Sequence, residues 1–345
     1  MIIGACGFTG SGSSAVSDYL KEFQSVNVFD RMEFILSHSP DGLEDLKYQL
    51  NDHCSKYSSS EVAIHRFRQN VDAYIIERIR SFKAKRRIGE LTDQYIKDIS
   101  QVTWGGCGSA DIQLHPSKVS RFIFQKARFL VTKMPLKIKT RWNVYPAHTM
   151  YFAAHVKNFD DITMKYVHDV LSALGADFSK PLVLNQPFSG TSPQLAFPFF
   201  DDPFAIVVDR DPRDLYISTV MSYVRHKGCY QIPSRDVEKF ATYYRMMRDD
   251  HLYKQKNDRI LVVRFEDMIY QYESTTSSIL KFCGINRSDH YKQFFFPEKS
   301  IVNTQTFKRF PDLLQDILYI EKHLSDYLYD FERFGSRSIH GKLWT

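Results

Sequence analysis

Short apolar runs alternate with stretches of helical periodicity along most of this 345-residue chain. The apolar runs predict six strands, at residues 1–7, 26–30, 129–135, 182–187, 204–211 and 260–267. Strands that are apolar throughout are typical of a parallel sheet that is buried on both faces. Because most of these runs are separated by helical patterns, we expect an α/β fold, a three-layer parallel sheet with helices on both faces.

The segment from about residue 40 to 125 differs from this alternation. It is polar and helical in pattern up to about residue 100, and no Pro-, Gly- or Ser-rich linker separates it from the rest. We therefore expect a single domain over residues 1–345 that carries a largely helical insertion at about 40–125. Apolar residues from Leu313 to Phe331 recur on one stripe and predict a packed terminal helix that begins after Asp312.

Composition narrows the function classes. The net charge of +6 favours anionic partners without saying which. No run approaches the roughly 18 apolar residues of a membrane span, and the first residues lack the features of a signal peptide, so the sequence predicts a cytoplasmic chain. The histidines show no metal-ligand spacing, and the basic run at 78–87 lacks the aromatic platform of a nucleic-acid site. Neither a metal nor a nucleic acid is expected.

The first strand leads directly into the glycine-rich stretch "GFTGSGSS" (7–14). Its spacing fits the phosphate-binding pattern G-x-x-x-x-G-K-[ST], except that Ser13 stands in place of the lysine. Small residues between a strand and a helix let backbone N–H groups surround an anion. A tight turn without a ligand is the structural alternative. The missing lysine argues against ordinary ATP or GTP hydrolysis.

A second constellation lies in "FAIVVDRDPRDLYIS" (204–218), where a buried strand ends near Arg210 and a helix carries Ser218. A guanidinium and a hydroxyl facing the same point suit a terminal phosphate monoester. In the alternative interpretation, Arg210 pairs with Asp211 or Asp214 and caps the helix.

Three motifs in this order resemble those of the sulfotransferases that use 3′-phosphoadenosine 5′-phosphosulfate (PAPS). They are "GSGSSAV", "VVDRDPRDLYIS" and "ILVVRFEDM", the last followed by a helix that ends in "LKFCGI". The resemblance implies the P-loop NTPase-like sulfotransferase fold of that family, with PAPS as donor, adenosine 3′,5′-bisphosphate as product and no metal requirement. It implies that the first loop binds the 5′-phosphosulfate and that a basic loop closes over the 3′-phosphate, which Arg210 and Ser218 bind. The residues in these roles are Gly10, Ser11, Gly12, Ser13, Ser14, Arg210, Ser218, Lys308 and Arg309.

The chain departs from the family at one position. Many members carry a lysine or arginine immediately before the S-G-[ST]-[ST] of the first loop, and this chain has Gly10 there. Sulfuryl transfer develops negative charge on the departing phosphate, which a positioned cation stabilises. Lys133, Arg66 and Lys308 are the candidates for that cation.

An acceptor hydroxyl or amine needs a general base within hydrogen-bonding reach. Some carbohydrate sulfotransferases place a glutamate near the end of the second strand. By that resemblance Glu33 is the first candidate for the base and His38 the second. The structural alternatives are an ion pair of Glu33 with Arg31 and an ordinary loop histidine at His38.

The acceptor is the least defined part of the prediction. In "PLKIKTRW" (135–142) basic and apolar residues alternate, which as a strand would present one basic face. With the positive net charge, this favours a saccharide, and an anionic one, over other small molecules. Two alternatives stay open: a P-loop phosphotransferase using Asp209 on the magnesium side, and a non-catalytic nucleotide-binding protein, which Gly10 would explain.

Overall fold

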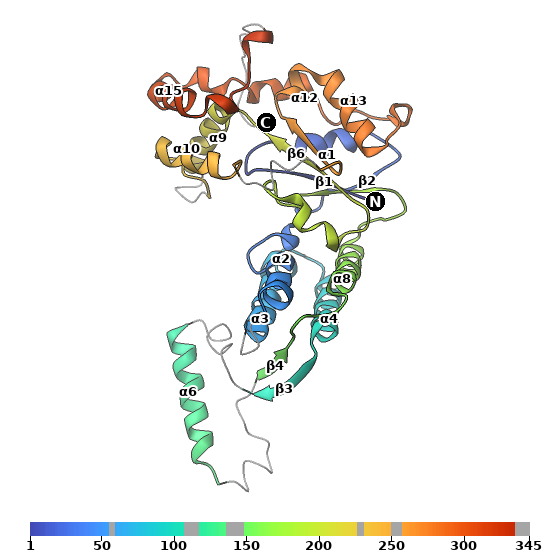
Figure 1. Cartoon of the computed structure of the whole chain (residues 1–345), viewed down its shortest axis with the longest axis vertical. Coiled ribbons are helices and arrows are strands. Elements are labelled where there is room, and N and C mark those ends of the chain that lie inside the picture. The colour runs from blue at the N-terminus through green and yellow to red at the C-terminus, as the bar shows by residue number, and fades with distance from the viewer. Residues whose placement is uncertain (55–58, 107–116, 136–147, 226–230, 250–256, 335–345) are drawn as a thin grey trace. The chain divides into compact units, whose positions relative to one another are not determined.

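A five-stranded parallel sheet organises most of the chain (Figure 1). The computed structural model describes residues 1–345 except 55–58, 107–116, 136–147, 226–230, 250–256 and 335–345. The described chain divides into two units. The sheet unit comprises residues 1–34, 177–197 and 201–345, and the helical unit comprises residues 35–176 and 198–200.

The sheet unit contains strands in the order β2-β5-β1-β6-β7, and every neighbouring pair is parallel. The strands are β1 (Ile2–Gly7), β2 (Asn27–Phe29), β5 (Leu182–Asn185), β6 (Pro203–Asp209) and β7 (Ile260–Arg264). The helices of this unit are α1 (Ser14–Leu20), α9 (Pro212–Arg225), α10 (Val237–Met246), α12 (Asp267–Tyr270), α13 (Tyr272–Cys283), α14 (Pro297–Ser300) and α15 (Leu314–His323). The prediction of an α/β fold with a parallel sheet flanked by helices is confirmed.

The core explains why these apolar runs form strands. Nearly every residue of β1 is buried, which requires cover on both faces of the sheet. On one face, Ile3 of β1 and Ile206 of β6 pack with Val16 of α1 and Ile279 of α13 in one apolar cluster. A second cluster joins α9, α10 and α15 through Phe240 and its neighbours. The first cluster joins the strands to the helices that cover them, and the second packs α9, α10 and α15 together.

The helical unit contains α2 (Leu43–Lys47), α3 (Ser59–Val71), α4 (Phe82–Ile99), α6 (Lys118–Lys133) and α8 (Phe159–Leu174). It also contains two antiparallel strands, β3 (Val102–Gly106) and β4 (His148–Phe152). Helices α4 and α8 pack through Tyr95 and Tyr166, whose rings stack with centroids 4.3 Å apart. Their buried hydroxyls bond to Thr163 and Thr92 at 2.9 Å, so no polar atom of this ring pair is left unsatisfied. The prediction of one domain with an insertion stays a prediction.

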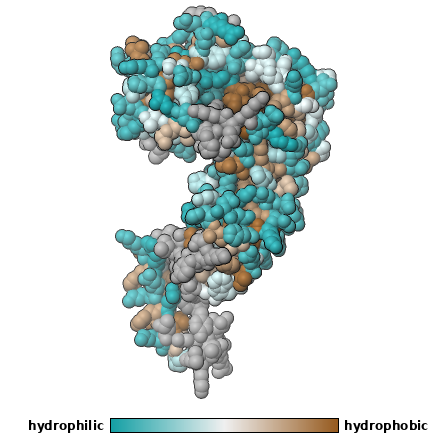
Figure 2. All heavy atoms as spheres, viewed as in Figure 1, coloured by the Kyte–Doolittle hydropathy of each residue, from teal (hydrophilic) through white to brown (hydrophobic). Residues whose placement is uncertain are grey.

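Two expectations about elements were wrong. The run at 129–135 is not a strand, because residues 118–133 form α6. A short run of β-branched and aromatic residues does not by itself distinguish a strand from a helix. Here apolar residues continue at helical spacing upstream to Val119. Figure 2 shows apolar and polar side chains next to each other on this helix.

The terminal helix is shorter than predicted. Helix α15 ends at His323, and Leu328 and Phe331 follow it outside the helix. Ile317 and Ile320 are buried, whereas Leu314 and Leu318 are exposed, so the buried face is narrower than the apolar stripe. Within the described ranges, no helix combines the length and the apolar character that a membrane crossing needs.

Candidate nucleotide site

Parallel pairing brings the carboxyl ends of all five strands to one edge of the sheet. Gly7 at the end of β1 pairs in register with Val208, and Asp209 at the end of β6 pairs with Arg264 of β7. The chain leaves β1 toward β2 and β5 on one side and meets β6 on the other side. Ligands of open α/β sheets bind at such a point, outside the carboxyl ends of the strands. The glycine loop lies there.

The glycine loop has the backbone of an anion cradle. Gly10 and Gly12 adopt φ of +80° and +88°, a region that disfavours side chains. A Cβ on Gly12 would also lie 2.7 Å from a ring carbon of Phe265. The N–H of Ser11 closes a turn on the carbonyl of Phe8 at 2.9 Å. Within the described part of the chain, the N–H groups of Gly12, Ser13 and Ser14 donate to no protein acceptor, as expected of a loop built to receive an anion.

Arg210 connects the glycine loop with the other predicted elements. The side chain follows β6 and is buried. Its Nη1 donates to the carbonyl of Gly10 and to Oγ of Ser218, both at 3.0 Å. Its Nη2 donates to the carbonyl of Asn303 at 2.5 Å. One guanidinium therefore joins the first loop, helix α9 and the segment that leads to Lys308.

A buried ion pair fixes the strand end that carries Arg210. Nε of Arg248 donates to both carboxylate oxygens of Asp209, at 3.0 and 3.1 Å. The guanidinium of Arg248 lies between two rings, 3.9 Å from the centroid of Phe8 and 3.4 Å from that of Tyr244. The Tyr244 hydroxyl donates to the carbonyl of Arg210 at 2.7 Å. The backbone of Arg210 is thus held from two directions.

Asp214 holds the basic loop against helix α9. Its carboxylate accepts the N–H groups of Gln305 at 2.8 Å and Thr306 at 2.6 Å. Burial, together with the charge of Asp211, raises the pKa of Asp214 to about 6. Lys308 donates from Nζ to Oε1 of Gln305 at 2.6 Å and is itself exposed. Arg309, also predicted for this loop, is half-buried.

Glu266 organises the turn beside Arg210. Its Oε1 accepts the N–H of Asp211 at 2.8 Å, and the side chain is completely buried. Burial raises the pKa of Glu266 to about 8, although Arg264 acts in the opposite direction. Asp211 in turn accepts hydrogen bonds from Arg213.

The candidates for the general base fall in different units. Glu33 is exposed and follows β2 at the same edge of the sheet. The N–H of Phe34 donates to the carbonyl of Asn185 at 2.8 Å, which holds this segment beside β5. His38 belongs to the helical unit, directly after the 3₁₀ turn Ile35–Ser37. The catalytic roles of Glu33 and His38 stay predictions.

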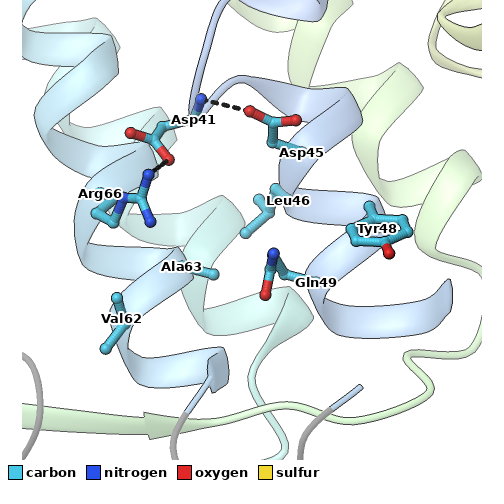
Figure 3. A pocket seen from close by; sticks show the side chains of 8 residues that line it. All are labelled: Asp41, Asp45, Leu46, Tyr48, Gln49, Val62, Ala63 and Arg66. Atoms are coloured by element: carbon cyan, nitrogen blue, oxygen red, sulfur yellow. Dashed lines mark hydrogen bonds and ion pairs between the residues drawn. The ribbon is translucent and has the colours of Figure 1, made fainter. Parts of the chain in front are cut away.

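The candidates for the leaving-group cation also belong to different units of the chain. Arg66 and Lys133 belong to the helical unit, whereas Lys308 belongs to the sheet unit. Arg66 forms an ion pair with Asp41 at 2.5 Å in a pocket of about 420 Å³ between α2 and α3 (Figure 3). Lys133 ends α6 and lies 5.4 Å from the ring centroid of Phe129. Among the three, Lys308 is the one tied to the segment that Arg210 binds. The basic strand predicted at 135–142 lies almost entirely outside the described residues.

Sequence reasoning missed several residues of this edge. Gln186, which follows β5 with φ of +54°, donates from Nε2 to Oγ of Ser13 at 2.9 Å. Ser17 of α1 donates to the side chain of Asn185. The amides in "LVLNQP" were a usable signal, because they follow a predicted parallel strand at the ligand-binding edge. Arg248 gave no such signal, because it lies 39 positions from Asp209.

The sequence match identifies the family. Residues 5–289 match the profile of the sulfotransferase family, and the chain belongs to that family. No curated protein matches its sequence.

Three of the solved structures that are similar to this chain share little sequence identity with it. A sulfotransferase domain from the curacin biosynthetic pathway has 14% identity over 86% of this chain and 77% of that chain, with a TM-score of 0.38. The sulfotransferase domain of the Synechococcus PCC 7002 olefin synthase has 12% identity over 83% and 72%, with a TM-score of 0.35. Sulfotransferase STF9 from Mycobacterium avium has 10% identity over 97% and 78%, with a TM-score of 0.38.

Proposed function

We propose that the protein is a PAPS-dependent sulfotransferase that transfers the sulfuryl group to a hydroxyl of its acceptor. Membership in the sulfotransferase family supports transfer of this group. The observation that carries the choice of donor is the guanidinium of Arg210, which bonds both to the glycine loop and to Ser218. A donor with phosphates on the 3′ and 5′ positions of one ribose needs two neighbouring anion sites, which we assign to these residues.

The residues at this edge suit such a nucleotide. The N–H groups of Gly12, Ser13 and Ser14, which donate to no acceptor among the described residues, would bind the 5′-phosphosulfate. Gly12 has no Cβ that would force the loop against Phe265. Arg210 and Ser218 would bind the 3′-phosphate, with Arg309 above it. An additional buried acceptor, Oδ1 of Asn303, has no partner among the described residues. It would accept a hydrogen bond from the nucleotide.

The chain must supply two things to the chemistry. When bound, PAPS provides an activated sulfuryl group whose departure leaves negative charge on the bisphosphate. Backbone N–H groups of the loop stabilise that charge, and Lys308 is the cation that we assign to assist them in the absence of a basic residue at position 10. Glu33 accepts the acceptor's proton, with His38 as the second candidate.

The hydrogen-bonding partners of Asp209 argue against phosphotransfer from ATP. A carboxylate at this strand end would have to face a magnesium ion in a P-loop kinase. Here Arg248 occupies both of its oxygens, and Arg264 lies 3.8 Å from one of them. Ser13 also stands in the position of the loop lysine. The chain therefore offers neither the magnesium-binding carboxylate nor the lysine on which a P-loop kinase relies.

The deciding experiment is a thermal melt with adenosine 3′,5′-bisphosphate in EDTA. We expect stabilisation of the wild type, and about tenfold to hundredfold weaker binding in Arg210→Lys and Ser218→Ala, because each loses hydrogen bonds to a charged group. Arg259→Ala is the matched control. Arg259 is an exposed arginine that pairs with Asp202 at the opposite edge of the sheet. Stabilisation by magnesium ATP alone, or equal binding by all variants, would contradict the proposal.

Transfer of labelled sulfate separates an enzyme from a binding protein. We expect Glu33→Gln to lower kcat by about 10²-fold or more while the affinity for the bisphosphate is unchanged. His38→Asn tests the second candidate in the same way. If no acceptor in a broad panel is labelled although the bisphosphate binds, the protein is a non-catalytic member of its family.

For the acceptor we propose an anionic saccharide, on the basis of the net charge of +6. Uronate-bearing or sulfated sugars should have a lower KM than matched neutral sugars, and the difference should shrink as salt is added. A preference for neutral acceptors at every salt concentration would refute this choice.

A further inference from the structure

Helix α6 exposes large apolar side chains along most of its length. Val119, Ile123 and Leu130 are 68%, 62% and 65% exposed, and their spacing places them on one face of the helix. Met134 continues this face directly after the helix. The helix makes no extended contact with another described helix or strand. Such a face is costly in water unless something covers it.

The charges of α6 are all of one sign. The helix carries five basic residues and no acidic residue: Lys118, Arg121, Lys126, Arg128 and Lys133. Two of them border the apolar face beside aromatic rings. Nζ of Lys126 lies 5.3 Å from the ring centroid of Phe122, and Nζ of Lys133 lies 5.4 Å from that of Phe129. Their aliphatic stems can thus follow an apolar phase while the ammonium groups reach its charged boundary.

We propose that α6 is an amphipathic helix that binds the surface of an anionic lipid bilayer. Val119, Ile123 and Leu130 lie on one side of α6, and Arg121 and Arg128 lie on the opposite side. An apolar face, a basic face and moderate overall hydropathy are the properties of helices that lie in the plane of the interface. The apolar face sinks into the acyl boundary, and the basic residues contact lipid phosphates. The helix lies on the membrane and does not cross it.

Charge favours a membrane over a second copy of this chain. Two α6 helices packed face to face would bring ten basic residues together, and neither helix carries an acidic residue of its own. The exposed face is about 24 Å long, at 1.5 Å per residue, which suits an extended surface. An acidic protein partner would satisfy the charges as well, and the experiment distinguishes it because vesicles contain no protein.

The test is flotation of the full chain with two kinds of vesicle, pure phosphatidylcholine and phosphatidylcholine mixed with phosphatidylglycerol. We expect binding to the anionic vesicles that falls at high salt, and little binding to the neutral ones. Lys126→Glu with Lys133→Glu should weaken binding more than about 25-fold, because each basic residue near the surface contributes about fivefold. Ile123→Ser with Leu130→Ser should weaken binding at every salt concentration.

Two matched pairs serve as controls. Lys83→Glu with Arg87→Glu makes the same change in net charge on exposed positions of α4. Val224→Ser with Met246→Ser removes equally exposed apolar groups from α9 and α10. Both pairs should bind vesicles like the wild type, and all variants should keep the melting temperature and the response to the bisphosphate.

Three results would overturn the inference. They are no binding to anionic vesicles, equal binding by the α6 variants and the wild type, and a dimer in solution that Ile123→Ser with Leu130→Ser dissociates. The response to the bisphosphate is measured separately, so failure here leaves the proposed function untouched.

Discussion

The sheet unit contains almost fully buried arginines, whereas the ion-paired arginines in the described part of the helical unit are partly exposed. In the sheet unit, Arg210 and Arg248 are almost fully buried and bond to groups from distant parts of the sequence. In the helical unit, ion pairs such as Arg68 with Asp72 and Arg86 with Glu90 join residues four positions apart at the surface. Buried charges cost free energy unless every partner is in place, whereas surface pairs contribute little. The difference marks the sheet edge as the part of the molecule where geometry is specified most strictly.

The largest expected difference concerns one arginine in each unit. Arg248→Ala should destabilise the protein by about 3–5 kcal/mol, because it leaves the carboxylate of Asp209 buried with its main partner removed. Arg68→Ala removes partners of Asp72 and Asp93, which are partly exposed, and should cost at most about 1 kcal/mol. Urea titrations of both variants measure these costs. If both variants lost the same free energy of unfolding, burial would not explain the difference between the two arginines.

The next effect is a dependence on pH that Glu266 imposes. The folded state raises its pKa from 4.5 to about 8, so between these values the folded protein binds more protons than the unfolded chain. The contribution of Glu266 is therefore most favourable below pH 4.5 and is lost as the pH rises toward 8. Glu266→Gln keeps the acceptor for the N–H of Asp211 and should flatten this part of the stability profile. An unchanged slope in melts from pH 5 to pH 8 would contradict the assignment.

The smallest effects have opposite signs at two glycines. Gly12→Ala should destabilise the protein by about 2 kcal/mol, because φ is +88° and the new Cβ meets Phe265. It should also weaken binding of the bisphosphate. Gly89→Ala in α4 places a Cβ no closer than 3.6 Å to Arg68 and should stabilise by about 0.5–1 kcal/mol through helix propensity. Two shifts of the same sign in thermal melts would argue against this description of the loop.

The sheet was largely predictable from the sequence because its signals are local. The apolar runs at 182–187, 204–211 and 260–267 became β5, β6 and β7. β5 and β6 are largely buried, and a strand buried on both faces must be apolar throughout, whereas β7 lies at the sheet edge and is only partly buried. The run at 129–135 became a helix, because a few β-branched and aromatic residues satisfy either period. The candidate site was predictable where a motif carries it, at Gly10 to Ser14, at Arg210 and at Ser218.

What the sequence determined by itself is the set of strands, the glycine loop and the residue types suited to two anion sites. Only the tertiary structure decided that Arg210 bonds to Gly10 and Ser218 together, that Arg248 neutralises Asp209, and that Gln186 reaches Ser13. These partners are 8 to 200 positions apart. The parallel order of the strands and the packing of α9 and α10 bring these partners together. Neither the strand order nor the helix packing can be predicted from the pattern of apolar and polar residues along the sequence.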